Sequence, residues 1–167
     1  MSEIRNRIVD PRISRNPSIW KTQGVMVDGV WRITLASTDP YGTFCKPPAI
    51  TSGTATDYYR ETPCVFYLRY RKSVDATLRI YRGGAQIDTG SDWCAWLVDG
   101  TVNAGEVSPL LELDGPPETV WVEPLEHGCY TVADWHRLRK LVGDGTLPTP
   151  WFDGDTYPRN SVGDSAS

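Results

Sequence analysis

Residues 62–84 read TPCVFYLRYRKSVDATLRIYRGG, and the alternation of side chains within this stretch decides the fold class. In an extended strand, successive side chains point to opposite faces of a sheet, so residues two apart share a face. The residues of the apolar face are Phe66, Leu68, Tyr70, Leu78 and Ile80. The residues of the polar face are Tyr67, Arg69, Arg71, Thr77, Arg79 and Tyr81. The stretch therefore predicts two half-buried β-strands, with one face toward a core and one toward water.

The link between these two strands predicts how they are arranged. Residues 72–75 (KSVD) are polar and are typical of a turn, so we expect the strands to pair as a hairpin. Gly83-Gly84 then ends the second strand, because glycine tolerates positive φ angles. The side of this hairpin that faces water carries arginine and tyrosine, which is the first indication of a binding role.

Further strands follow from similar patterns along the chain. Asp28-Gly29 is a strong signal for a tight turn, and it joins a strand at residues 25–27 to one at 30–36. Other strands are expected at 92–98, 110–113 and 119–122, with Ile8-Val9 as a candidate short edge strand. Short strands, frequent turn signals and no long helix favour an antiparallel β-sandwich. We expect one domain over residues 1–157 and a flexible C-terminal tail over residues 158–167.

One amphipathic helix is predicted at about residues 132–142. Thr131 is the N-cap candidate, with Asp134 three residues later, and apolar residues recur at helical spacing up to Leu141. Basic residues occupy the last turns, and Gly143 is expected to end the helix.

Composition excludes several classes of protein. The chain has 167 residues, a formal net charge of −4 and a pI of about 5.1, which argues against binding nucleic acid through its phosphates. No apolar run is typical of a signal peptide or is long enough to span a membrane, so neither is expected. The cysteines are Cys45, Cys64, Cys94 and Cys129, and without a CxxC pair they predict buried, reduced side chains rather than a zinc site. Disulfides become plausible only outside a cell.

The sequence offers little for catalysis. Its only histidines are His127 and His136, and no nucleophile elbow, phosphate-binding loop or HExxH motif is present. Asp153-Gly154-Asp155 supplies two carboxylates, which is fewer ligands than calcium needs, so an ordinary turn is the simpler reading. We therefore expect neither an enzyme nor a resident metal or cofactor.

The residues predicted to bind a ligand or partner are those on the polar side of the two strands, with Trp93 and Trp96 as candidates to extend the aromatic surface. They are Tyr67, Arg69, Arg71, Arg79, Tyr81, Trp93 and Trp96. Aromatic rings and arginines suit a glycan, through stacking and charge-assisted hydrogen bonds. The same residue types are favoured at protein–protein interfaces, which is the preferred reading here. A third reading is that they cover the sheet without any partner. Trp93 and Trp96 are expected on opposite faces of one strand.

The C-terminal motif WFDGDT, residues 151–156, resembles a motif of minor tail proteins from long-tailed bacteriophages of actinobacteria. It follows a strand (TVWVEPL) and a short helix (ADWHRLRKL), and residues 6–20 and 67–81 are similar to those proteins at the level of pattern. The resemblance implies a jelly-roll type of β-sandwich, similar to carbohydrate-binding modules. Those proteins usually carry further domains, and likeness of fold does not identify a ligand.

From this resemblance we expect a structural virion protein of a phage tail, assembled in the host cytoplasm. Its expected partners are other tail or virion proteins, with a host cell-wall glycan and further copies of the chain as additional candidates. The alternatives are a free-standing carbohydrate-binding module and a capsid decoration protein.

Overall fold

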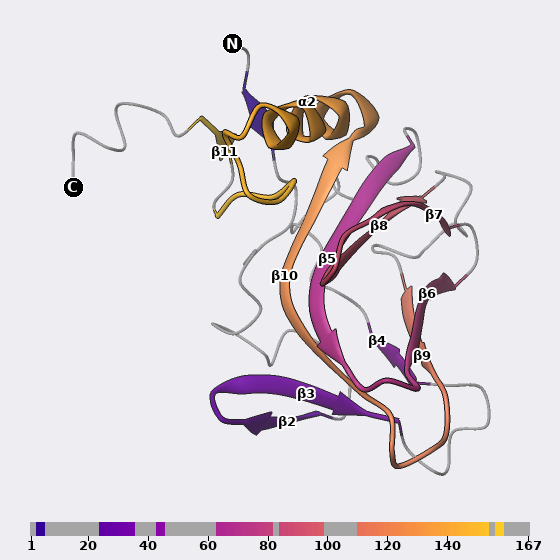
Figure 1. Ribbon diagram of the computed structural model, residues 1–167. Coiled ribbons are helices and arrows are strands. Elements are labelled where there is room, and N and C mark those ends of the chain that lie inside the picture. Colours follow the sequence, from indigo (N-terminus) through magenta and orange to yellow (C-terminus); the bar gives the residue numbers. More distant parts are fainter. Residues whose placement is uncertain are drawn as a thin grey trace, which may run out of the picture.

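The computed structural model describes residues 3–5, 24–35, 43–45, 63–81, 84–98, 110–153 and 156–158 (Figure 1). The strands are β1 Ile4–Arg5, β2 Gly24–Val27, β3 Val30–Thr34, β4 Thr43–Cys45, β5 Cys64–Lys72, β6 Thr77–Tyr81, β7 Gly84–Thr89, β8 Trp93–Val98, β9 Leu110–Asp114, β10 Trp121–Thr131 and β11 Thr156–Tyr157. The helix is α2 Val132–Gly143. Within these residues the chain is mostly β with a single helix near the C-terminus, which confirms the predicted fold class.

The strands form two facing sheets and a small addition. The larger sheet has six strands in the order β2-β3-β10-β5-β8-β7, and the smaller has three in the order β4-β9-β6. β1 and β11 form a separate two-stranded sheet beside the helix. Every pairing is antiparallel. The described residues thus form an antiparallel β-sandwich. Their single helix, α2, lacks the length and the apolar character that a membrane-spanning helix needs.

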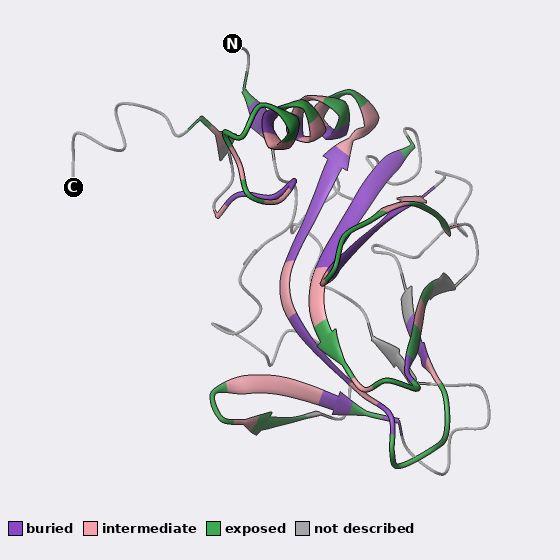
Figure 2. Ribbon diagram, in the orientation of Figure 1, coloured by how far each residue is buried: buried purple, intermediate pink, exposed green. Residues whose placement is uncertain are grey.

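The six-stranded sheet has a hydrophobic core on each face. The inner core lies between the two sheets and includes Phe66 and Trp96 from the larger sheet and Leu113 from the smaller. The outer core lies on the opposite face, under α2 and the segment that follows it, and includes Tyr67 and Trp135. Because β5 passes between both cores, its first five residues are all buried (Figure 2).

The link after β5 carries the chain to the other sheet, so the predicted hairpin is wrong. β5 pairs with β10 and β8, whereas β6 pairs with β9. The turn itself is present, since the Ala76 amide donates to the Ser73 carbonyl oxygen at 3.1 Å, but it joins two layers of the sandwich. The alternation of side chains correctly predicts that Phe66, Leu68, Tyr70 and Leu78 face the inner core. It carries no information about which strand lies alongside.

Several local predictions are confirmed. Asp28 and Gly29 have φ angles of 51° and 79°, as the tight turn between β2 and β3 requires. Thr131 caps α2 by accepting a hydrogen bond from the Asp134 amide at 3.1 Å. Gly143 is the last helical residue rather than the stop, and the positive φ angle of 77° falls on Gly145.

Other predictions need correction or lie outside the described residues. β7 was not predicted, and β10 continues to Thr131 well beyond the strand expected at 119–122. Cys64, Cys94 and Cys129 are buried free thiols, as expected. The candidate strand at Ile8-Val9 and the tail beyond Pro158 fall outside the described residues, as do Gly154 and Asp155 of the candidate calcium turn.

Candidate functional site

The outer face of the six-stranded sheet carries a set of charged side chains that a β-bulge in β10 brings together. Glu123 lies opposite Arg71 of β5, and Glu126 lies opposite Arg69, with a register shift between them. The extra residue lets two glutamates three positions apart share the outer face, which a regular strand does not allow. Pro124 sits at this irregularity, where the missing amide hydrogen of proline is tolerated. The bulge therefore aligns two arginines with two carboxylates.

The first row of this face crosses β3, β10 and β5. The Glu123 carboxylate, whose side chain is only 5% exposed, lies 3.4 Å from Nε of Arg71 and 3.6 Å from Nη2 of Arg32. The Arg32 guanidinium also lies over the Trp121 ring, at 4.1 Å from its centroid. A buried carboxylate thus holds two guanidinium groups in place, and the Arg71 side chain remains 57% exposed. The row presents positive charge to solvent.

The second row crosses β10, β5 and the turn before β8. Arg69 donates from Nε to the Asp92 carboxylate at 2.8 Å and from Nη1 to Glu126 at 3.1 Å. The hydrogen bond to Asp92 is the largest cause of a raised pKa for Arg69. Both carboxylates converge on one guanidinium, so this row is acidic where the first is basic. Arg69, Arg71, Arg32, Glu123, Glu126, Asp92 and Trp121 are called the arginine–carboxylate face below.

Three of the four aromatic residues predicted for this exposed surface, Tyr67, Trp93 and Trp96, are buried, and their expected exposure is wrong. Tyr67 is fully buried and Trp93 is 7% exposed, because both lie in the outer core against Trp135 of α2. Trp96 is 2% exposed and stacks on Phe66 in the inner core at 6.1 Å between ring centroids. Trp93 and Trp96 do lie on opposite faces of β8, as predicted. The alternation of β5 is also correct, but a helix covers the first half of its polar face.

Two sets of contacts hold α2 and the segment after it, together called the cover, against this half of the sheet. Trp151 donates from Nε1 to the His127 carbonyl oxygen at 2.9 Å. Arg139 of α2 binds Asp88 of β7 at 2.6 Å, and its guanidinium lies 5.4 Å from the centroid of the Trp93 ring. Burial is the largest cause of the raised pKa values of Tyr67 and Tyr130 beneath the cover. Their hydroxyl groups are therefore held protonated.

The remaining two predicted residues belong to the smaller sheet. Arg79 of β6 pairs with the buried Glu112 of β9 and lies 3.3 Å from Asp114. Leu78 beside it packs on the inner core, so Arg79 points to the outside of the smaller sheet, opposite to Arg69 and Arg71. Tyr81 pairs along the backbone with Leu110, and its side chain lies outside the described residues. Of the six predicted residues whose side chains the structure describes, only Arg69 and Arg71 share one exposed face.

Sequence reasoning missed five residues of the arginine–carboxylate face. They are Arg32, Asp92, Trp121, Glu123 and Glu126. The available signal was Pro124 within a strand pattern, since proline in a central strand marks a bulge. No group of three or more histidine, cysteine, aspartate or glutamate side chains suited to a metal occurs among the described residues.

Comparison with known proteins adds no relative: no family model, no curated protein and no solved structure matches this chain. The arginine–carboxylate face is therefore interpreted from its own chemistry.

Proposed function

We propose that this chain is a structural virion protein of a bacteriophage tail, and that it docks on other tail subunits through the arginine–carboxylate face. The assignment to a tail rests on the resemblance of the WFDGDT motif and its flanking elements. The assignment to docking rests on the face itself. The proposed role is binding and assembly rather than catalysis.

The single observation that carries the docking proposal is the first row of the face. Arg32 and Arg71 are aligned on the buried Glu123, with Trp121 half-buried beside them. Arginine and tryptophan are the residue types most often found to dominate binding energy at interfaces. Guanidinium groups that are already oriented lose less side-chain entropy on binding than free ones. This row therefore suits a partner that presents carboxylates or backbone carbonyl groups.

The same geometry favours a protein partner over a glycan. Sugar binding by stacking needs exposed aromatic rings, and Tyr67, Trp93 and Trp96 are buried in the two cores. The most exposed side chains of the arginine–carboxylate face are the charged ones of Arg71, Asp92 and Arg69. Three of the four aromatic rings expected to stack on a sugar are therefore inaccessible, which weakens the alternative of a free-standing carbohydrate-binding module.

The experiment that tests this proposal is antibody labelling of phage particles, viewed by electron microscopy. An antibody raised against this chain is expected to label the tail of intact particles. Label on the head would contradict the tail assignment and favour a decoration protein. No label on particles, together with retention of the purified chain on host cell walls, would contradict the structural role altogether.

A further inference from the structure

Two cysteines meet on β5 and β10, the two central strands of the six-stranded sheet. Cys64 is the first residue of β5, and Cys129 lies near the end of β10, two positions before the last residue of that strand. In the register of the two strands Cys64 lies opposite Thr131, and Cys129 opposite Phe66. The two cysteines are thus diagonal neighbours, and both point into the inner core. Diagonal neighbours on one face of a sheet are about 7–8 Å apart, which is slightly more than the Cα separation of an unstrained disulfide, so closing this pair requires the two strands to move toward each other.

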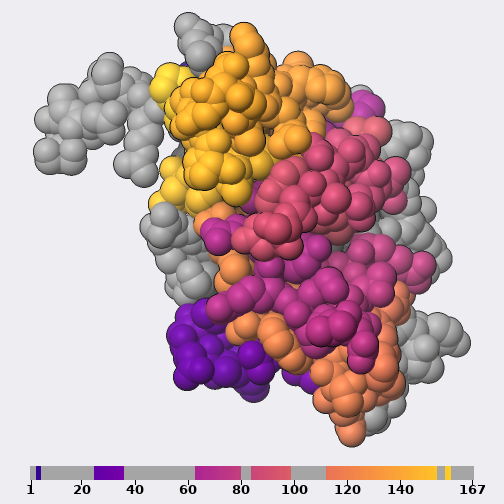
Figure 3. Space-filling view, in the orientation of Figure 1, coloured from indigo at the N-terminus to yellow at the C-terminus, as the bar shows by residue number. Residues whose placement is uncertain are grey.

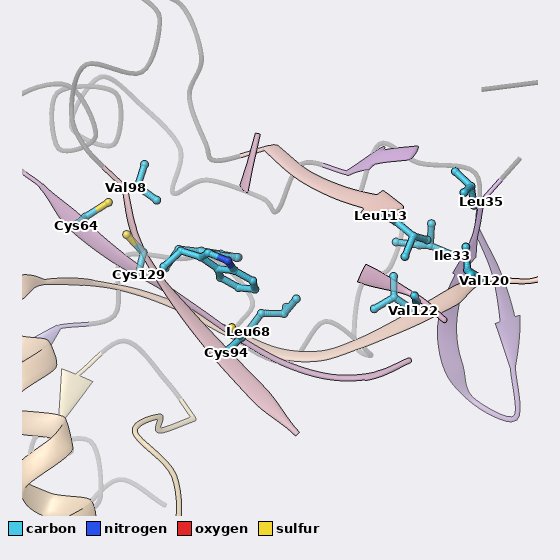
Figure 4. Packing of buried hydrophobic residues seen from close by; sticks show 13 residues of the cluster. Ile33, Leu35, Cys64, Leu68, Cys94, Val98, Leu113, Val120, Val122 and Cys129 are labelled. Carbon is cyan, nitrogen blue, oxygen red and sulfur yellow. The ribbon is translucent and has the colours of Figure 1, made fainter. Parts of the chain in front are cut away.

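The two thiol groups are in contact. Cys64 and Cys129 share a side-chain hydrogen bond, and their sulfur atoms point toward one another in the core (Figure 4). Cys94 is part of the same core, but Figure 4 shows it beside Leu68, away from this pair. Both thiols of the pair are fully buried, so the contact does not depend on solvent or on a flexible surface.

We propose that Cys64 and Cys129 form a redox pair that closes into a disulfide between β5 and β10 when the protein meets an oxidant. The reduced form belongs to the host cytoplasm and the oxidised form to the surroundings of a released particle. That timing rests on the proposed virion role, whereas the pairing of the two thiols does not. The disulfide would link the two strands that pass between both cores.

The oxidant must be small, because neither sulfur is exposed. Hydrogen peroxide fits this requirement: one thiolate attacks a peroxide oxygen, and with uptake of a proton it gives a sulfenic acid and water. The neighbouring thiol then attacks the sulfenic sulfur, forms the disulfide and releases a second water. Two thiols lose two electrons in total, and one peroxide gains them.

The environment of the two thiols sets the rate at which they are oxidised. The hydrogen bond to Cys129, followed by burial, raises the pKa of Cys64, so little thiolate exists in the folded protein. Reaction therefore requires local opening, and both cysteines lie toward the ends of their strands, where opening is easier than at the strand centres. We expect oxidation that is slow at neutral pH and faster at mildly alkaline pH.

Peptide mapping of the full chain tests the proposal. The folded protein is treated with hydrogen peroxide, free thiols are alkylated under denaturing conditions, and the chain is cut after Lys, Arg and Glu. This digestion places Cys64 in residues 62–69, Cys94 in residues 83–106 and Cys129 in residues 127–137. The expected product is a disulfide-linked pair of peptides, residues 62–69 and 127–137. Before digestion, the oxidised chain should be lighter than the reduced chain by the mass of two hydrogen atoms.

Two variants serve as controls. Cys94→Ala is expected to retain the linked peptide, and Cys129→Ala to lose it. The oxidised wild type should also unfold at a higher temperature than the reduced form, and a reductant should reverse this difference. Alkylation of both Cys64 and Cys129 after treatment would overturn the proposal, as would a link from either residue to Cys45 or Cys94. The wild-type map gives this answer even if a variant fails to fold.

Discussion

The outer face of the six-stranded sheet has two halves that are built from the same strands and differ in what lies on them. In the covered half, Tyr67 of β5 and Tyr130 of β10 pack under α2 and are fully buried. In the open half, Arg69 and Arg71 of β5 extend from the same face toward solvent and pair with carboxylates. Figure 2 shows β5 changing from buried to exposed along its length. One half is packed into a core, and the other stays open to solvent.

The chain path explains which half is covered. β10 continues directly into α2, whose N-cap is the last residue of the strand, so the helix lies over that end of the sheet. The open half lies toward the opposite end, where the β2–β3 hairpin is found. In the space-filling view the orange helix lies at the top and the purple β2–β3 hairpin at the lower left (Figure 3).

The largest effect is expected for Trp135→Ala in the covered half. Trp135 is 3% exposed and contacts the rings of Tyr67, Trp93 and Tyr130. Its removal should lower the free energy of unfolding by about 3–5 kcal/mol, measured by chemical denaturation. His136→Ala next to it replaces an exposed side chain and should change the value by less than about 0.5 kcal/mol. Similar values for both variants would show that the helix does not contribute to the core as described.

Alkaline pH should also act through the covered half. Burial raises the pKa of Tyr67 and of Tyr130, so the folded chain keeps two protons that the unfolded chain releases above about pH 10. The free energy of unfolding should therefore fall as pH rises above that value, by up to about 1.4 kcal/mol per unit for each tyrosine. Ultraviolet absorbance of tyrosinate, followed together with circular dichroism, measures both events, and Tyr67→Phe should reduce the loss. Ionisation of all eight tyrosines near pH 10 in a folded chain would contradict this account.

A smaller loss is expected for Gly128→Ala beneath the covered half. An added Cβ would lie 2.4 Å from the Tyr130 hydroxyl oxygen and 2.6 Å from its ring carbons, so the ring must move. Crowding of this kind costs about 1–3 kcal/mol, which thermal or chemical unfolding can measure. Gly143→Ala at the end of α2 meets no atom within 4 Å and should be neutral or slightly stabilising. Equal behaviour of the two variants would argue against the packing of Tyr130 on the strand.

The smallest stability effect belongs to the open half. Glu123→Gln removes the charge that holds Arg32 and Arg71, and should cost about 1–2 kcal/mol because the carboxylate is buried. Glu118→Gln, in an exposed turn, should cost less than about 0.5 kcal/mol. A Glu123→Gln chain as stable as the wild type in chemical denaturation would mean that the carboxylate does not organise the two arginines.

The sequence predicts which side chains share a face far better than it predicts what covers that face. Alternation correctly places Phe66 and Leu68 toward the inner core and Tyr67 away from it. It fails for the exposure of Tyr67 and Trp93, since their burial depends on a helix more than sixty positions away from Tyr67 in the chain. The packing of a distant helix on a strand leaves no periodic signal in the sequence of that strand.

The candidate site shows the same limit. Arg69 and Arg71 are identified from local sequence alone, whereas Glu123 and Glu126 become partners only through the bulge of β10. A regular strand would place these glutamates on opposite faces. The one-residue bulge in β10 therefore decides whether Arg69 and Arg71 both lie opposite a glutamate. Pro124 is the only sign of this bulge in the sequence.

The central claim, that the open half docks and the covered half stabilises, is tested most directly with Arg71→Ala. Its binding to tail particles assembled without this chain is compared with that of the wild type and of Lys72→Ala, its exposed neighbour. Arg71→Ala should weaken binding about tenfold or more, while the free energy of unfolding changes by less than about 1 kcal/mol. Unchanged binding by Arg71→Ala, or an equal loss for Lys72→Ala, would contradict the claim.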